Sequence, residues 1–269
     1  MSAAATRRFA TLAREAIQDA VRRRVVAAIT VMSLLSLMLV DSCTSCAAGT
    51  VTIDGAVTDA LNVAGWTGAV TFLVLGLWTI VLAGVLASEH LVQTLADGSA
   101  ALCLARPVGR GSFALARLTG ALAIALAAGA LLLGGTAGLF HVRSGLGLAP
   151  ALAAGAACAL GMVAGGSLAM FASLYLGRTA ALLLAFALTA VVGTANALSL
   201  AGAELAGFLD AVDRFGPPLL SAMALGLSDW IPEASLPADP IEVALRLLGW
   251  AGAGVALLCV AFRRLEITN

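Results

Sequence analysis

Long apolar stretches dominate the chain, and short polar segments separate them. Because the hydrocarbon core of a bilayer is about 30 Å thick, a helix needs roughly 20 predominantly apolar residues to cross it. The stretches that approach or exceed this length are residues 25–40, 61–88, 113–139, 148–175, 179–201 and 243–262. The alternation of a barrel strand is missing from them, so the pattern predicts an all-α, polytopic membrane protein with six transmembrane helices.

The residues before the first stretch follow a different pattern, that of an amphipathic helix. Over residues 7–23, apolar side chains share one face of a helical wheel and arginines lie on the opposite face, which is typical of a helix at the membrane interface. We therefore expect a cytoplasmic interfacial helix at 1–24 and a six-helix transmembrane domain at 25–269. The expected anchor residues are Phe9, Leu12, Arg14, Ile17, Arg22 and Arg23. Whether the polar face also contacts a partner stays open.

Composition agrees with lipid as the solvent. Of the 269 residues, 61% are hydrophobic and 11% are charged, whereas water-soluble domains have about 25% charged residues. All 15 basic residues are arginines, and all but Arg143, Arg214 and Arg246 fall on one predicted side of the membrane. Most acidic residues fall on the other side. The positive-inside rule then places both termini in the cytoplasm, as in a multi-pass protein of the bacterial cytoplasmic (inner) membrane.

The segment EHLVQTLADGSAALCLARPVGRGSFALAR, residues 89–117, connects the second and third predicted spans. Asp97-Gly98 predicts a change of chain direction, and Ser99 is suited to cap a short helix that ends before Pro107. A short helix held between two spans suits the transmission of force, because displacing it tilts both. The alternative is an ordinary basic loop that obeys the positive-inside rule.

Together with LAREAIQDAVRRR before the first span, this segment resembles the membrane subunit of ABC-2-type exporters, in the six-span family resembling the nitrous-oxide-reductase maturation permease. The resemblance implies a homodimer that binds two copies of a separate cytoplasmic ABC ATPase through a coupling helix at 99–106. ATP and Mg would be bound by that ATPase, with no cofactor in this chain. The implied coupling residues are Glu89, Asp97, Gly98, Ser99, Leu102, Arg106, Pro107 and Arg110. The chain departs from the family at Gly109, where serine is usual, and at Arg117, where lysine is common.

The sequence lacks the residues that several kinds of catalytic and transport site require. Without lysine there is no Walker A motif, and the sequence also lacks G-x-S-x-G and H-E-x-x-H, so we expect no enzyme in this chain. The stretches 118–140, 144–177 and 179–203 contain no Asp, Glu, Lys, Arg or His. A proton relay needs such ionisable residues inside the spans, so this pattern disfavours one. Two alternatives remain: an ATP-independent secondary transporter or channel, and a membrane scaffold for assembly of an extracytoplasmic protein.

The predicted outer loops and the small residues of the spans raise further expectations. Cys43 and Cys46 form either a disulfide or half of a metal site, and we expect no complete metal site. In the loop 202–242, apolar residues at helical spacing predict a surface helix that ends at Gly216, either a lid or a plain connector. Close helix packing is expected at two small-residue pairs: Gly134 with Gly138, and Gly161 with Gly165. Hydrogen bonds between helices are expected from Ser167, Ser173, Thr194 and Asn196.

Overall fold

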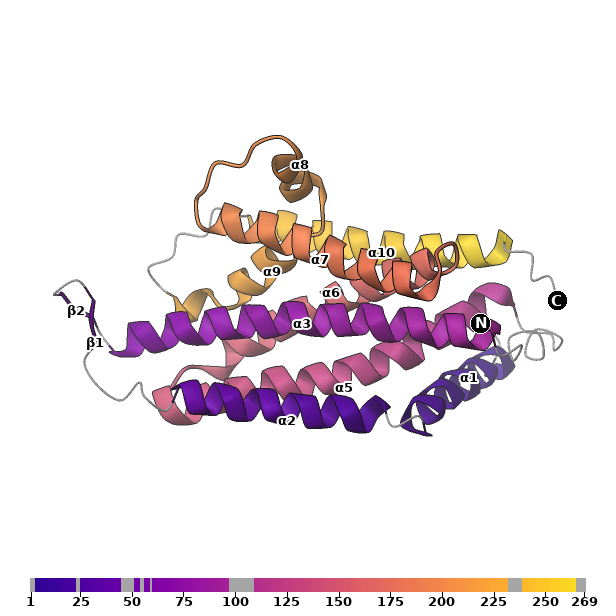
Figure 1. Ribbon diagram of the computed structural model, residues 1–269, viewed down its shortest axis with the longest axis horizontal. Helices are drawn as coiled ribbons and strands as arrows, with labels where there is room; N and C mark the ends of the chain where they lie inside the picture. The colour runs from indigo at the N-terminus through magenta and orange to yellow at the C-terminus, as the bar shows by residue number, and fades with distance from the viewer. Residues whose placement is uncertain are drawn as a thin grey trace.

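The computed structural model describes residues 3–22, 25–44, 51–53, 56–58, 60–96, 109–231 and 239–264. Almost all of these residues are helical, and the helices run side by side along one axis (Figure 1). The helices are α1 (Ala3–Arg22), α2 (Val25–Thr44), α3 (Ala60–Ala96), α5 (Arg110–Ser144), α6 (Leu148–Ser173), α7 (Arg178–Leu200), α8 (Phe208–Phe215), α9 (Leu219–Gly226), the 3-10 turn η1 (Ser228–Trp230) and α10 (Pro240–Arg264). A small antiparallel hairpin, which the sequence analysis did not predict, pairs β1 (Val51–Ile53) with β2 (Ala56–Thr58).

Among the residues that the structure describes, five helices are long and apolar enough to cross a membrane, which is typical of a multi-pass membrane protein. Their apolar spans are Val63–Val92, Arg110–Ser144, Leu148–Ser173, Thr179–Leu200 and Pro240–Arg264. Each overlaps a predicted stretch, so these five predictions are confirmed. The first predicted stretch corresponds to α2, whose apolar part within the described residues is the shorter segment Thr30–Ser42.

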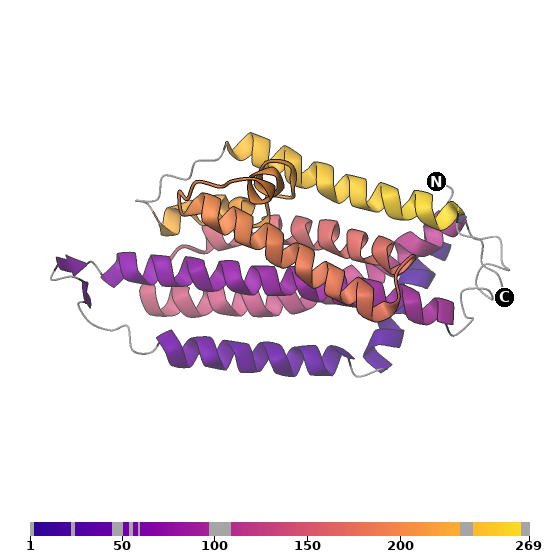
Figure 2. The ribbon, with the colours of Figure 1, turned by 45° about the horizontal axis from the view of Figure 1, so that its top comes forward.

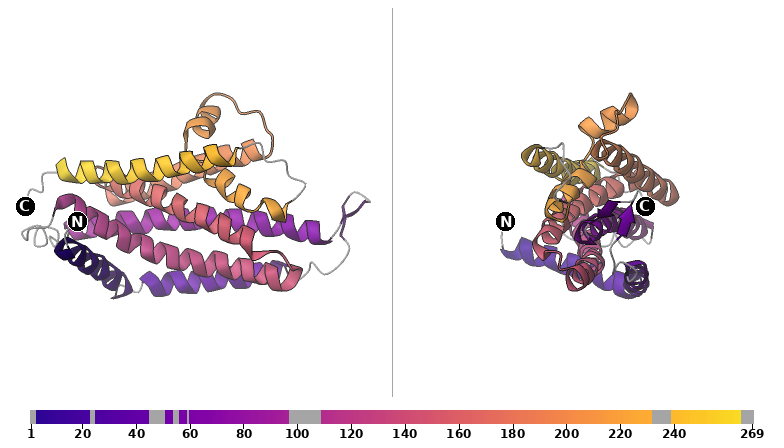
Figure 3. Two further views of the ribbon diagram at one scale, coloured as in Figure 1. Left: turned by 180° about the vertical axis from the view of Figure 1, so that it is seen from behind. Right: turned by 90° about the vertical axis from the view of Figure 1, so that its left-hand side faces the viewer.

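The centre of the bundle is α3, which packs against α6 and α5, while α10 packs mainly on α6. α7 and α10 lie on one side of the bundle, and α2 lies on the opposite side, mainly against α5 (Figures 2 and 3). Gly161 and Gly165 explain the close fit of α6 to α3: an added Cβ would lie 2.8 Å and 3.0 Å from side-chain carbons of Ile80. This pair confirms its prediction. At Gly134 and Gly138 an added Cβ would meet nothing within 4 Å, so the prediction of close helix packing at this pair is wrong within the single chain.

The chain between α7 and α10 contains more structure than predicted. The predicted surface helix is present as α8 and ends before Gly216. After two prolines the chain turns back as α9 and η1, whose Leu219, Met223 and Trp230 are buried in the bundle. The Trp230 indole donates a hydrogen bond from Nε1 to the Gly147 carbonyl at 2.9 Å, and its ring packs edge-on against Phe72. This segment therefore contributes to the core instead of resting on the surface.

Polar groups in the spans behave differently from one another. Ser167 and Ser173 donate to carbonyls three residues earlier in their own helix, so the expected bonds between helices are not formed by these two serines. Asn196 on α7 does form them, with residues of α8 and α9. A serine hydroxyl is short enough to be satisfied by its own helix, whereas an asparagine amide extends to a neighbour.

Candidate functional site

The arginine-rich end of the bundle is the candidate site. α1, the end of α3, the start of α5 and the end of α10 gather there (Figures 1 and 3). Described arginines at this end are Arg14, Arg110, Arg117, Arg263 and Arg264. At the opposite end, α2 and α5 are joined by an ion pair between Arg143 and Asp41. The described side chains thus place five arginines at one end of the bundle and the Arg143–Asp41 pair at the other. Which end faces the cytoplasm stays a prediction.

The end of α3 is held in the core almost to the last described residue before the connecting segment. Leu91 is fully buried, and Ser88, His90 and Thr94 are buried beside it. The Thr94 hydroxyl donates to the carbonyls of Leu91, at 2.8 Å, and His90, at 3.1 Å, so it needs no partner outside the helix. The last turns of α3 are therefore helical and packed against the rest of the bundle up to Thr94.

The start of α5 is fastened to the end of α10. The Phe113 ring stacks on Phe262, with ring centroids 5.9 Å apart and an interplanar angle of 26°. Two residues earlier in α5, an added Cβ on Gly111 would lie 3.3 Å from Nε of Arg263, so the arginine side chain lies directly over this glycine. Aromatic pairs of this kind contribute about 0.5–1.5 kcal/mol beyond their buried area. The first turns of α5 cannot move without α10.

Arg117 is the unexpected residue of this end. Only 6% of its surface is exposed, and its guanidinium carbon lies 5.4 Å from the centroid of the Phe113 ring. Within the part of the chain that the structure describes, its Nε has no hydrogen-bond partner. The cation–π contact offsets about 0.5–2 kcal/mol of the cost of burying that charge, which is less than the several kcal/mol that desolvation takes. The sequence analysis noted Arg117 only as the basic residue opening a span; its position inside an apolar run was the available signal.

Helix α1 packs onto the bundle through small residues. Ala16 is fully buried, and an added Cβ on Gly120 of α5 would lie 2.5 Å from its Cβ. Among the expected anchor residues, Phe9, Leu12 and Ile17 are half-buried and Arg14 is exposed. Arg22 lies in α1 with its side chain outside the described residues, and Arg23 lies outside them altogether. Part of the apolar face thus contacts protein, and its contact with lipid stays a prediction.

Most of the predicted coupling residues cannot be placed. Glu89 is half-buried near the end of α3, and Arg110 is the exposed first residue of α5. The other predicted coupling residues lie outside the described residues: Asp97, Gly98, Ser99, Leu102, Arg106 and Pro107. Of the two outer cysteines, Cys43 falls in the last turn of α2 and Cys46 lies outside the described residues. Of the predicted coupling residues, only Glu89, two turns before the end of α3, and Arg110, at the start of α5, fall within the described residues.

The chain matches no protein-family model, and it has no significant match among curated proteins. The resemblance of residues 89–117 to ABC-2-type permeases therefore rests on the motifs of that segment and on the order of the spans. The structure adds the packing of α1 on α5 and of the start of α5 on the end of α10.

Proposed function

We propose that the chain is the transmembrane permease subunit of an ATP-driven ABC-2-type exporter, which couples ATP hydrolysis by a separate ATPase subunit to substrate movement. One observation carries the proposal: the segment containing ARPVGR joins α3 and α5, the two longest helices, at the arginine-rich end. A partner that moves this segment would act on both helices at once. The resemblance of the same segment to the coupling region of that family supports the assignment.

The lengths of the two helices suit them to act as levers. α3 has 37 residues and α5 has 35, so at 1.5 Å per residue each is over about 50 Å long, well beyond a hydrocarbon core of about 30 Å. Their packed ends pass a displacement into the bundle instead of absorbing it. Because packed interfaces switch between discrete arrangements, a small shift at the segment favours alternation between two packings of the spans.

The proposal includes a sixth span and an orientation. α2 has 20 residues, which is about 30 Å, and exposes Met32, Leu35 and Met38 away from the bundle, as a lipid-facing helix does. With the arginine-rich end in the cytoplasm, both termini are cytoplasmic and the protein lies in the bacterial inner membrane. α1 then lies where its arginines meet anionic headgroups.

The proposed complex contains two permease subunits and two ATPase subunits. ATP and Mg belong to the ATPase, and this chain supplies no catalytic residue. One bundle of this size leaves little room for a complete path, so the path is placed between the two protomers of a homodimer. ATP-driven closure of the ATPase pair moves the 99–106 helix, and the connected spans change their packing.

The test is reconstitution of the tagged full chain with the ABC ATPase encoded beside it. We expect the two to co-purify, and we expect the permease to change the rate of ATP hydrolysis. Arg106→Glu and Arg110→Glu should weaken the complex, because both reverse charge at the proposed contact. Glu204→Arg, an exposed charge reversal beyond α7 at the other end, is the matched control and should leave it intact. An intact complex whose ATP hydrolysis ignores both arginine changes, or transport driven by an ion gradient without ATP, would reject the proposal.

A further inference from the structure

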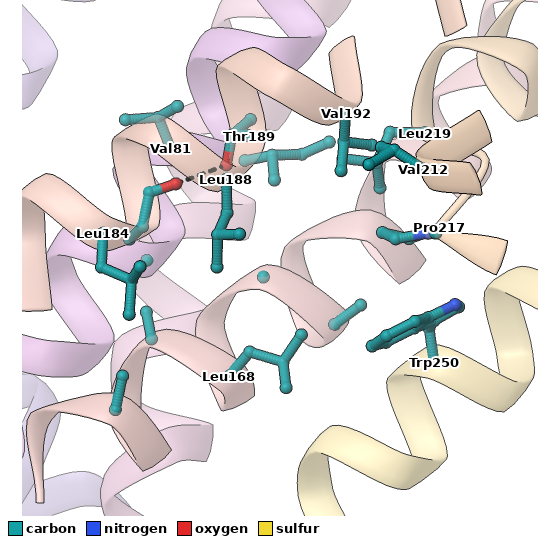
Figure 4. Close-up of a pocket in the computed structure, with 18 of the residues that line it drawn as sticks. Val81, Leu168, Leu184, Leu188, Thr189, Val192, Val212, Pro217, Leu219 and Trp250 are labelled. Atoms are coloured by element: carbon teal, nitrogen blue, oxygen red, sulfur yellow. Dashed lines mark hydrogen bonds between the residues drawn. The ribbon is translucent and has the colours of Figure 1, made fainter. Parts of the chain in front are cut away.

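A cavity of about 490 Å³ lies on the side of the bundle opposite α2, between α3, α6, α7, α8 and α10. Leu168, Leu188 and Trp250 point into it from α6, α7 and α10 (Figure 4). Along α7, Leu184, Leu188 and Val192 line it at four-residue steps, so it follows the helix for about 12 Å. The cavity is therefore elongated along the direction in which lipid chains run.

The lining offers a ligand almost nothing polar. The Thr189 hydroxyl is the one side-chain polar group on α7 at the cavity, and it already donates to the Ala185 carbonyl at 2.9 Å. A polar ligand would lose its hydrogen bonds to water here without replacing them, at a cost of about 1–3 kcal/mol per group. A hydrocarbon chain loses none.

The cavity is open toward the surroundings of the bundle. Leu188, Phe208 and Phe215 line it and yet are each more than one third exposed. In a spanning bundle the surroundings at this level are lipid, so a chain from the bilayer enters sideways without crossing water. The occupant is therefore already present at high concentration next to the opening.

Helix α8 covers one end of the cavity. Phe208, Val212 and Phe215 lie on its cavity-facing side. The helix is also tied to the bundle by polar contacts: Asn196 donates to the Asp213 carboxylate, and the Trp250 indole donates to the Phe215 carbonyl at 3.0 Å. These contacts keep an apolar helix face over the cavity.

Helix α8, which covers this end of the cavity, carries an exposed positive charge at Arg214. Arg214 lies between the cavity-lining residues Val212 and Phe215 on α8, is exposed, and has its guanidinium carbon 5.8 Å from the centroid of the Phe215 ring. It forms no ion pair within the described part of the chain. An apolar slot with an exposed guanidinium at its end complements an amphiphile that has a hydrocarbon chain and an anionic phosphate.

We propose that this cavity is a binding site for one acyl chain of a bilayer phospholipid, with α8 over its end and Arg214 facing the phosphate. The site does not require the ATPase or ATP, so it stands or falls separately from the proposed function. The gain is van der Waals packing, because the chain fills apolar space whose lining, including Leu168, Leu188 and Trp250, would otherwise lack contacts.

The test uses Trp250 as the reporter in the full chain, reconstituted in phosphatidylcholine vesicles without ATP. Trp66→Phe and Trp78→Phe remove the two exposed tryptophans, and Trp230 stays because it is buried. Lipid brominated on its acyl chains should quench most of the Trp250 emission. Ala185→Phe, which fills the cavity, should restore that emission, whereas Ala187→Phe, an exposed position outside the lining, should not. Equal quenching in both variants would overturn the proposal.

A second variant and a headgroup comparison complete the experiment. Gly84→Leu fills the cavity from α3, and the backbone should tolerate it, because an added Cβ would meet Ala169 and Ala185 at ordinary distances of 3.4 Å and 3.6 Å. It should restore the emission as Ala185→Phe does, and continued full quenching would count against an acyl chain in the cavity. Arg214→Gln should weaken quenching by brominated phosphatidylglycerol. Unchanged quenching by this anionic lipid would overturn the phosphate contact.

Discussion

Asn196 on α7 donates a hydrogen bond from Nδ2 to Oδ1 of Asp213 on α8, over 2.8 Å. The same amide accepts a hydrogen bond at Oδ1 from the backbone N–H of Leu220 in α9, at 3.3 Å. Asn196 is almost completely buried, so a single side chain connects three helices away from water. The buried asparagine in this apolar helix is thereby explained by the segment that folds back against it.

We expect Asn196→Leu to destabilise the protein by about 1–3 kcal/mol, because it leaves the Leu220 N–H and the Asp213 carboxylate without their partner. Thermal unfolding in detergent measures the loss, and hydrogen exchange over 208–215 should increase. Thr189→Val is the matched control on α7, since its hydroxyl bonds only to its own helix and should matter little. Equal effects of the two substitutions would contradict this role of Asn196.

Arg246 on α10 holds α8 from the other side. Its Nη2 donates to the carbonyl of Asp213 and, at 2.8 Å, to the carbonyl of Gly216. Arg246→Met should cost about 1.5–3 kcal/mol, the range for hydrogen bonds to a charged group. In a double-mutant cycle with Asn196→Leu the two losses should fall short of additivity by about 0.5–3 kcal/mol, because both hold Asp213. Strict additivity would mean that the two contacts act independently.

The contact of α1 with α5 depends on Gly120. A valine there would drive side-chain carbon into Ala16, at a cost of about 1–3 kcal/mol for overpacking, so we expect α1 to separate and become sensitive to protease. Gly134→Val, on the same helix with nothing within 4 Å, is the control and should leave α1 protected. Protection of α1 in both variants would show that it does not depend on this contact.

Gly65 on α3 lies against the backbone carbonyl of Trp230, and an added Cβ would collide with that oxygen. Because backbone cannot yield as a flexible side chain does, Gly65→Ala should lower the unfolding midpoint and displace η1. Gly249→Ala in α10 meets nothing and should be neutral or stabilise by about 0.5–1 kcal/mol. Trp230 fluorescence reports the displacement, and a midpoint unchanged by Gly65→Ala would refute the close approach.

Replacement of Arg117 is expected to stabilise the protein, unlike the destabilising substitutions above. Arg117→Met keeps the length of the side chain while removing a buried guanidinium whose Nε has no hydrogen-bond partner among the described residues, which should raise the free energy of unfolding by about 1–3 kcal/mol. Arg264→Met, at an exposed position of α10, should change it by less than about 0.5 kcal/mol. A loss of stability at Arg117 would mean that the guanidinium is held by a favourable contact in the membrane-embedded protein.

The spans could be predicted because each is a continuous apolar run long enough for a bilayer, and α8 because its apolar residues recur at helical spacing before two prolines. The burial of α9 and η1 could not. Residues 219–226 are apolar apart from Ser221, a pattern shared by lipid-facing and core segments. Only contacts in the packed bundle, such as Met223 against Gly76 and Trp230 against Gly65, distinguish the two. The hairpin β1–β2 was missed because its strands have only three residues each.

Apolar length by itself identified the five helices that are long enough to cross a membrane, and the placement of arginine predicts how the segments between them divide between two sides, because bilayer thickness and charge act on each segment separately. Which small residues contact each other, where the Arg117 guanidinium is buried and where an open cavity remains depended on the packed bundle. Those properties arise between segments distant in the chain, and a linear pattern holds no information on which faces meet.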